Sequence, residues 1–188
     1  MIADLDRTLF ALIHDHWRAP LLDRVMPVVT DRWFWALPLL ALVAHSALRR
    51  RERVLRLVIA SAVLLVLSDW CANTLKGMVR RPRPGTTVAS MGESAGRAAS
   101  YSLPSGHATN SFALATFWSL AHPELAVPLL GCASLVAYSR VYLGDHHPVD
   151  VLAGALLGAT LGLIAVIVAG ARGTRGRRAG PRPGSPVP

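Results

Sequence analysis

Three short polar segments hold the residues of this chain that could act on a phosphate group. They read KGMVRRPRP at 76–84, PSGH at 104–107 and SRVYLGDHHPVD at 139–150. Lys76 supplies a point charge, whereas Arg83 and Arg140 offer planar guanidinium groups that match two phosphate oxygens at once. These cations predict an anion-binding site where the fold brings the three segments together.

The PSGH segment can add backbone donors to the same site. Pro104 and Gly106 punctuate the chain just before the apolar stretch SFALATFWSLA, which predicts that a helix begins here. The N–H groups of Ser105, Gly106 and His107 would open that helix, and a helix N-terminus is a natural seat for phosphate. Gly106 has no side chain to block the approach of a phosphate to the backbone.

Two histidines and one carboxylate could carry the reaction itself. Pro148 suits the first turn of a helix, which places Asp150 about one turn from His146. A carboxylate at that distance can hold one ring nitrogen and make the other a better nucleophile. His107 has no carboxylate at i+4, which suits an acid that protonates a leaving oxygen.

A metal centre is the alternative use of this cluster. Its potential ligands are His107, Asp145, His146, His147 and Asp150. Neighbouring histidines beside three cationic side chains make a poor site for another cation, so we expect neither a metal ion nor another cofactor.

The blocks K-x6-RP, PSGH and SR-x5-H-x3-D, in this order and spacing, resemble the three-part signature of the type 2 phosphatidic acid phosphatases, the PAP2 superfamily. That superfamily includes membrane lipid phosphatases, glucose-6-phosphatase and soluble vanadate-dependent haloperoxidases. The resemblance covers about residues 60–165 and points to the bacterial membrane lipid phosphatases. It implies that His146 is the nucleophile, Asp150 its orienting residue and His107 the general acid. The phosphate ligands that it implies are Lys76, Arg83, Ser105, Gly106 and Arg140.

The composition indicates a membrane protein. The 188 residues have a mean hydropathy of +0.39, with 52% hydrophobic and only 16% charged residues, whereas soluble domains average about 25% charged. The net charge of +9 comes from arginines that flank apolar blocks, which argues against nucleic-acid binding. Cys71 and Cys132 lie in apolar segments without CxxC spacing and are expected to be buried thiols.

The apolar pattern predicts an all-α integral membrane bundle of about five transmembrane helices, preceded by an amphipathic surface helix over residues 1–19. Pro20 and Pro27 bracket a connector. The expected spans are 28–48, 57–75, 108–121, 125–138 and 148–169. Gly154, Gly158 and Gly162 recur every four residues, which suits close helix packing in a membrane. We expect residues 1–170 to form the phosphatase domain and 171–188 a disordered basic cytoplasmic tail.

The distribution of arginines predicts the orientation. The basic hinge at 49–56 and the C-terminal tail each carry five arginines, which places both in the cytoplasm. The connections 76–104 and 139–147, and the phosphate site with them, then face the periplasm or cell exterior. Positive charge is disfavoured on that side of the membrane, so the cations of the 76–104 connection indicate an anionic ligand. Contact with lipid headgroups is the alternative explanation for Arg80 or Arg81.

We therefore expect a metal-independent phosphatase of the inner or plasma membrane that cleaves a lipid phosphate through a phosphohistidine. Undecaprenyl diphosphate is the favoured substrate; phosphatidylglycerophosphate, phosphatidate and lipid A 1-phosphate are alternatives. Two other classes stay open, a vanadate-dependent haloperoxidase and a non-enzymatic lipid-binding protein. Asp69 and Asn73 lie on the helix face leading to Lys76, and we expect Asp69 to pair with a site cation. The remaining histidines at 14, 16, 45 and 122 have no partner at useful spacing.

Overall fold

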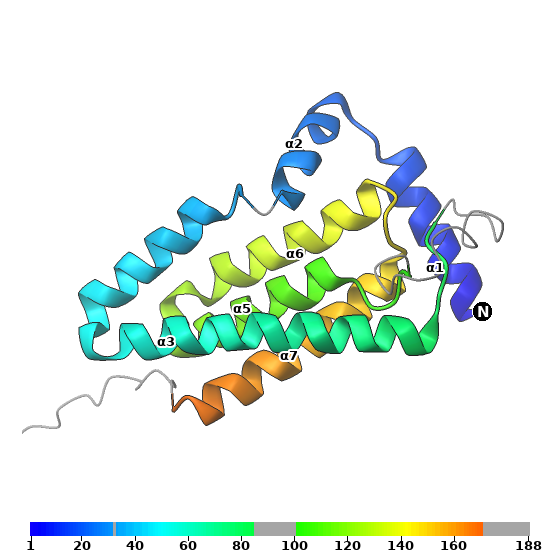
Figure 1. Ribbon diagram of the computed structural model, residues 1–188. Coiled ribbons are helices and arrows are strands. Elements are labelled where there is room, and N and C mark those ends of the chain that lie inside the picture. Colours follow the sequence, from blue (N-terminus) through cyan, green and yellow to red (C-terminus); the bar gives the residue numbers. More distant parts are fainter. Residues whose placement is uncertain (32, 85–100, 171–188) are drawn as a thin grey trace, which may run out of the picture.

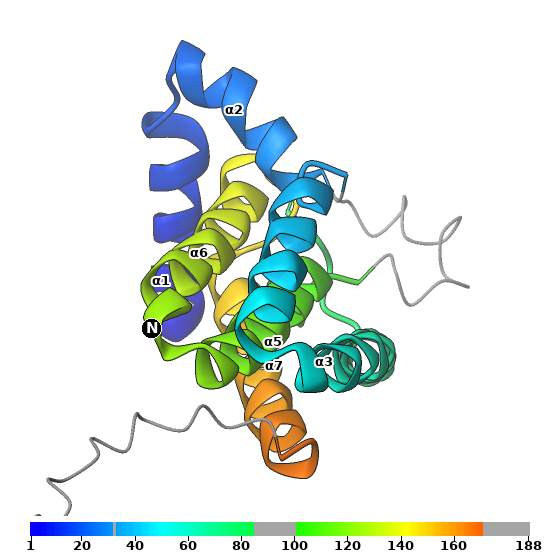
Figure 2. The ribbon, with the colours of Figure 1, turned by 90° about the vertical axis from the view of Figure 1, so that its left-hand side faces the viewer.

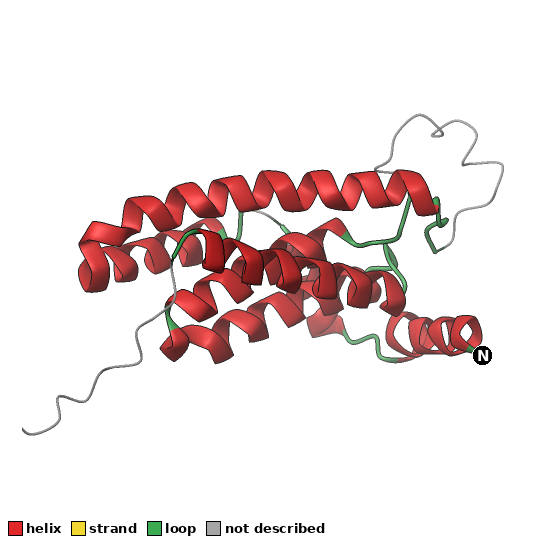
Figure 3. Cartoon of the chain, turned by 90° about the horizontal axis from the view of Figure 1, so that it is seen from below, coloured by secondary structure: helices red, strands yellow, loops and turns green. Residues whose placement is uncertain are grey.

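The computed structural model describes residues 1–31, 33–84 and 101–170, without the side chains of 49–52. All of the regular structure in these residues is helical, as the sequence predicts (Figure 3). The proposed tail at 171–188 and most of the loop before the PSGH segment lie outside the described residues.

The N-terminal part forms two helices instead of a surface helix followed by a connector. Helix α1 spans Ile2–Ala11 and continues into a short π-helical segment, η1, at Leu12–His16. Helix α2 then spans Pro20–Thr30, where the sequence predicted a connector and the start of the first span. Pro20 stands in the first turn of α2, where a missing N–H costs no hydrogen bond. This proline therefore begins a helix, whereas the sequence predicted that it begins a connector.

The next helix, α3, covers Ala36–Val79 and contains the later part of the first predicted span and all of the second. Its apolar parts are Ala36–Leu48 and Arg53–Val79. The chain changes direction between them, so that the second part lies alongside the rest of the bundle (Figure 1). The predicted basic hinge is therefore helical and marks this change of direction.

Three more helices complete the bundle. Helix α5 spans Gly106–Ala121, a short 3-10 segment η3 at Pro123–Leu125 follows, and α6 spans Ala126–Tyr142. Helix α7 spans Pro148–Val168. The end of α3, the starts of α5 and α7 and the end of α6 gather at one end of the bundle, and α1 lies against that end (Figures 1 and 2).

Among the described residues, three helical segments are long and apolar enough to cross a membrane. They are Arg53–Val79, Pro123–Tyr142 and Pro148–Val168. The segment Ala36–Leu48 is apolar but shorter, and α5 has 16 residues where a bilayer needs about 20. The all-α membrane bundle is thus confirmed, while spanning by these two shorter segments stays a prediction.

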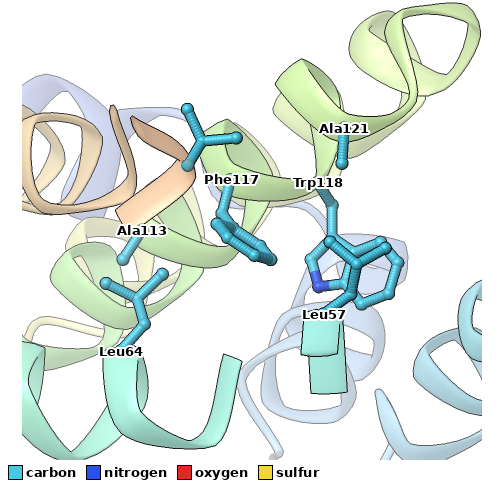
Figure 4. Close-up of a cluster of buried hydrophobic side chains, with 7 residues drawn as sticks. Leu57, Leu64, Ala113, Phe117, Trp118 and Ala121 are labelled. Carbon is cyan, nitrogen blue, oxygen red and sulfur yellow. The ribbon is translucent and has the colours of Figure 1, made fainter. Parts of the chain in front are cut away.

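The core of the bundle lies where α3, α5 and α7 meet. Leu57, Leu64, Phe117 and Trp118 are all buried there, with small alanines between them (Figure 4). The indole N–H of Trp118 donates to Oγ of Ser61, so the ring is buried with its polar atom satisfied. This packing fixes α5 against α3 and so sets the position of the PSGH turn at the start of α5.

The glycine row of α7 is the closest contact in the bundle, as its spacing predicted. A Cβ added to Gly154 would come within 2.5 Å of the carbonyl oxygen of Ser105, and one added to Gly162 within 2.5 Å of that of Ala113. A Cβ at Gly158 would overlap the carbonyl oxygen of Thr109. These backbone contacts let α7 carry its first turn right up to the PSGH segment.

We expect Gly158→Ala to destabilise the folded protein by about 1–3 kcal/mol, because the new methyl group has to push α5 and α7 apart. The loss would be measured as a lower midpoint of thermal unfolding in detergent. Gly131→Ala in α6 is the matched control, since a Cβ there meets nothing within 4 Å. Equal midpoints for the two variants would contradict the close approach.

Candidate active site

Backbone hydrogen bonds bring the three polar segments together. The N–H and the hydroxyl of Ser102 both donate to the carbonyl oxygen of Arg81, which ties the PSGH segment to the end of α3. The N–H of Ser105 donates to the carbonyl oxygen of Asp150 at 2.9 Å, which ties the same segment to α7. The N–H groups of Asp145 and His146 donate to the carbonyl oxygen of Arg140. The predicted site residues therefore converge at one end of the bundle.

Lys76 and the start of α5 form one side of the site. Lys76 is 6% exposed, and its Nζ would lie 3.6 Å from a Cβ placed on Gly106. The hydroxyl of Ser105 is buried and has no hydrogen-bond partner among the described residues. A buried ammonium group beside a helix N-terminus and an unpaired hydroxyl is a suitable environment for an anion.

One donor expected from the sequence is already used. The N–H of Ser105 is bonded to Asp150, so it holds the PSGH segment in place instead of facing a ligand. The backbone donors left at the start of α5 belong to Gly106, His107 and Ala108, because the first N–H groups of a helix have no partner within the helix.

Arg83 and Arg140 both contact the carboxylate of Asp145. Nη2 of Arg140 lies 2.9 Å from Oδ2 of Asp145, and Nη1 of Arg83 lies 3.8 Å from Oδ1 of the same residue. Arg140 also donates to the hydroxyl of Thr30 at 2.6 Å, which links α2 to the site. An anionic side chain thus sits between the two guanidinium groups expected to bind phosphate.

His146 and Asp150 lie as the helix start predicted. Pro148 occupies the first position of α7, with an extended His147 before it. Oδ2 of Asp150 accepts from the N–H of His147 at 2.8 Å and lies 3.7 Å from Nδ1 of His146. This last separation is longer than a hydrogen bond. Nδ1 faces the carboxylate, so Nε2 is the nitrogen left for chemistry.

The surroundings keep the His146 ring neutral. Burial lowers the pKa of the His146 imidazole below its usual value, and the nearby cationic Arg83 and Arg140 lower it further, while Asp150 acts in the opposite direction. His107 is within electrostatic range of Arg140, His146, Asp145 and Lys76. A neutral imidazole and a second histidine therefore share one cationic site.

Two residues in direct contact with this site were not predicted. Arg81 donates to Oδ1 of Asp150 at 2.6 Å and to Oδ2 of Asp6, so it points inward and not toward lipid headgroups. Asp6 was expected on the polar face of a surface helix, yet it is 2% exposed. The K-x6-RP block gives no signal for Arg81, and no local pattern marks Asp6, because its partners lie far away in the sequence.

Asp69 and Asn73 point along the flank of the bundle. Asn73 donates to Oδ2 of Asp69 at 3.0 Å, and both line a groove with Trp70, Thr74 and Asn110. The charge of Asp69 acts on Lys76, but the described contacts contain no direct ion pair between the two. The expected pairing is thus a longer-range attraction, and the groove lies between α3 and Asn110 of α5.

His45, His122 and Glu124 form a cluster that the sequence spacing did not reveal. Their ligand atoms lie within 4.8 Å of one another. Hydrogen bonds explain the arrangement, because His122 contacts Oε1 of Glu124 at 3.3 Å and Oγ of Ser46 at 3.2 Å. The cluster follows the end of α5, whereas His107 is at its start, so it is remote from the phosphate site. His14 also has a partner, the carbonyl oxygen of Tyr142.

Comparison with known families identifies the chain. The family model of the PAP2 superfamily matches residues 55–173, which include all three polar segments. The chain belongs to the PAP2 superfamily. The bundle agrees with a membrane member of that superfamily, because several of its described helical segments are long and apolar enough to cross a membrane.

Several relatives within the PAP2 superfamily have named substrates. The chain is 35% identical over 108 residues to a lipid A 1-phosphatase of Rhizobium johnstonii, covering 55% of this chain and 44% of the relative. It thus spans less than half the length of that relative. A decaprenylphosphoryl-5-phosphoribose phosphatase of Mycobacterium tuberculosis is 36% identical, covering 71% of this chain and 72% of the relative. YbjG of Escherichia coli, a candidate undecaprenyl-diphosphatase, is 33% identical, covering 84% and 79%.

A solved structure within the PAP2 superfamily has the same fold. The crystal structure of Aquifex aeolicus LpxE superimposes with a TM-score of 0.59 at 27% sequence identity. The match covers 87% of this chain and 95% of that one. The likeness therefore extends over the whole helix bundle and beyond the three polar segments.

Proposed function

We propose that this protein is a membrane lipid phosphatase that transfers a phosphoryl group from a lipid to His146 and then to water. The observation that carries the proposal is the placement of His146, whose Nδ1 faces Asp150 while the ring is buried beside Arg83 and Arg140. A neutral imidazole held by a carboxylate is an activated nucleophile. The surrounding cations are suited to the charge on the transferred group, which is the main requirement of phosphoryl transfer.

The proposed steps use residues at the mouth of the bundle alone. Nε2 of His146 attacks phosphorus, and the bond to the lipid oxygen breaks as His107 donates a proton to that oxygen. His107 then takes a proton from water, which attacks the phosphohistidine and releases inorganic phosphate and His146. Lys76, Arg83, Arg140, Ser105 and the N–H groups at Gly106 and His107 hold the phosphoryl oxygens. No step calls for a metal ion.

For the substrate we propose a lipid phosphate with a long apolar tail, with undecaprenyl diphosphate first. The match to YbjG covers most of both chains and supports this choice. Lipid A 1-phosphate and phosphatidylglycerophosphate are the runners-up, the first because a lipid A 1-phosphatase is among the relatives. The groove along α3 would let a lipid reach Lys76 from the side while its tail stays in the membrane.

The proposed location is the inner or plasma membrane, with the site outside and the C-terminus in the cytoplasm. The arginines of the 49–56 hinge support this orientation, since positive charge is retained on the cytoplasmic side. An impermeant thiol reagent on intact cells should then label a cysteine placed at Ser94 and spare one placed at Ser185. The reverse labelling would place the site inside.

A panel of purified lipids tests the function directly. We expect release of inorganic phosphate from undecaprenyl diphosphate to be fastest, to continue in excess EDTA, and to be inhibited by vanadate, which mimics five-coordinate phosphorus. Faster release from lipid A or phosphatidylglycerophosphate would replace the proposed substrate. Complete loss in EDTA that Mg²⁺ or Zn²⁺ restores would contradict the metal-free mechanism.

A further inference from the structure

We propose that Asp6 and Arg81 form a clamp that holds the carboxylate of Asp150 in position for His146. This makes α1 a working part of the active site and not only a helix on the membrane surface. The clamp rests on the roles proposed above for His146 and Asp150.

Arg81 connects the two carboxylates through the two ends of its guanidinium group. Nη1 donates to Oδ1 of Asp150 at 2.6 Å, and Nη2 donates to Oδ2 of Asp6 at 2.5 Å. The other oxygen of Asp6, Oδ1, accepts from the N–H of Val149 at 2.9 Å. Asp6 therefore forms hydrogen bonds both with Arg81 and with the first turn of α7, the turn that contains Asp150. In Figure 1, α1 lies across the end of the bundle where these segments meet.

The clamp leaves Asp150 with one orientation. Its Oδ1 is bonded to Arg81 and its Oδ2 to the N–H of His147, so both oxygens are fixed and the plane of the carboxylate is set. The fixed carboxylate attracts Nδ1 of His146 from one direction. The orientation of the ring, and with it the direction of Nε2, follows from that contact. Oδ2 of Asp150 lies 3.7 Å from Nδ1 of His146. A shift of the carboxylate would therefore change the contact that orients the His146 ring.

The burial of Asp150 explains why the clamp contains both an arginine and a second carboxylate. Asp150 is 0% exposed and Asp6 2%, and buried charges are costly unless they are paired and hydrogen-bonded. The flat guanidinium fork can satisfy two carboxylates in fixed directions, whereas a lysine offers a single point charge. Asp6 gains further from the N-terminus of α7, where the helix dipole favours an anion.

The two members come from different parts of the chain. Arg81 lies two residues before Arg83 within the K-x6-RP block, so one block supplies a phosphate ligand and a positioning residue. Asp6 lies outside residues 55–173, the part that the PAP2 family model matches. The N-terminal helix thus adds a contact that the signature residues do not contain.

The test compares two clamp variants with two neighbours. Asp6→Asn keeps the shape of the side chain but removes its charge, and Arg81→Lys keeps the charge but loses the planar fork that bonds the two carboxylates in fixed directions. We expect either change to lower kcat by about 10- to 100-fold, the scale for a slightly misplaced reacting group, with unchanged inhibition by vanadate. Asp4→Asn and Arg80→Gln are the controls, since both side chains are exposed, and they should keep the wild-type kcat.

A double variant shows whether the clamp acts through Asp150. If it does, adding Asp6→Asn to Asp150→Asn should lower kcat little further, because the carboxylate to be held is gone. A full additional loss, or wild-type kcat in both clamp variants, would overturn the clamp while leaving the phosphatase mechanism intact. Wild-type kcat in Asp150→Asn alone would instead overturn the proposed roles of His146 and Asp150, and the clamp with them. If Asp6→Asn fails to fold, Arg81→Lys in the same two backgrounds decides the question.

Discussion

His146→Ala is expected to lose turnover on every lipid phosphate, with a fall in kcat on the order of 10⁶-fold, the scale seen when an enzyme loses its nucleophile. The physical reason is that His146 supplies the proposed attacking atom, Nε2, while its Nδ1 faces Asp150. Neither formation nor hydrolysis of a covalent intermediate can proceed without it. The measurement is release of inorganic phosphate under single-turnover conditions, which separates loss of chemistry from loss of binding.

The matched control is His16→Ala, because His16 is an exposed histidine at the end of η1. It should keep full activity, which shows that a histidine change as such does no harm. Vanadate-dependent protection of the His146→Ala protein against heating would show that the phosphate-binding cations are still in place. Turnover that persists in His146→Ala would remove this residue from the mechanism.

His107→Ala is expected to lower kcat by roughly 10²- to 10⁴-fold on a lipid monophosphate such as phosphatidate, whose alkoxide oxygen needs a proton in order to leave. The loss should be much smaller on an activated phosphate ester that departs without a proton. His107 is also the proposed base for the attacking water, so the variant should form the phosphoenzyme on that ester and release it slowly. An initial burst of leaving group followed by slow turnover is the result to look for.

The comparison between the two classes of substrate distinguishes the role of His107 from simple damage to the site. A variant with a distorted cationic cluster would be equally impaired on both. Equal losses on the lipid and on the activated ester would therefore contradict a role for His107 as the acid.

The parts of the site that local sequence patterns encode were predictable. The helix starts at Gly106 and Pro148 follow from proline and glycine chemistry, and so does the spacing between His146 and Asp150. The close approach of α7 to α5 follows from the glycine row. In each of these cases the residues that determine the geometry are a few positions apart, so their spacing in the sequence is enough to predict it.

The parts that depend on distant partners could not be read from the sequence. In an amphipathic helix, polarity predicts that a carboxylate faces water. Asp6 is buried instead, because its hydrogen bonds with Arg81 and with the N–H of Val149 offset the cost of its desolvation. The N–H of Ser105 was expected to face phosphate, and only the fold shows it bonded to Asp150. The sequence pattern does not predict α2, because Pro27 lies within the helix and a proline at that position usually indicates its end.

The central claim is that the phosphoryl group is carried by His146, and trapping it there is the most direct test. Wild-type protein would be mixed with substrate labelled in the transferred phosphate, quenched within milliseconds and digested for peptide mapping. The account predicts label on the peptide that contains His146, stable in base and labile in acid as a phosphohistidine should be. Label on His107 instead, or a persistent absence of label while His146→Ala still turns over, would contradict it.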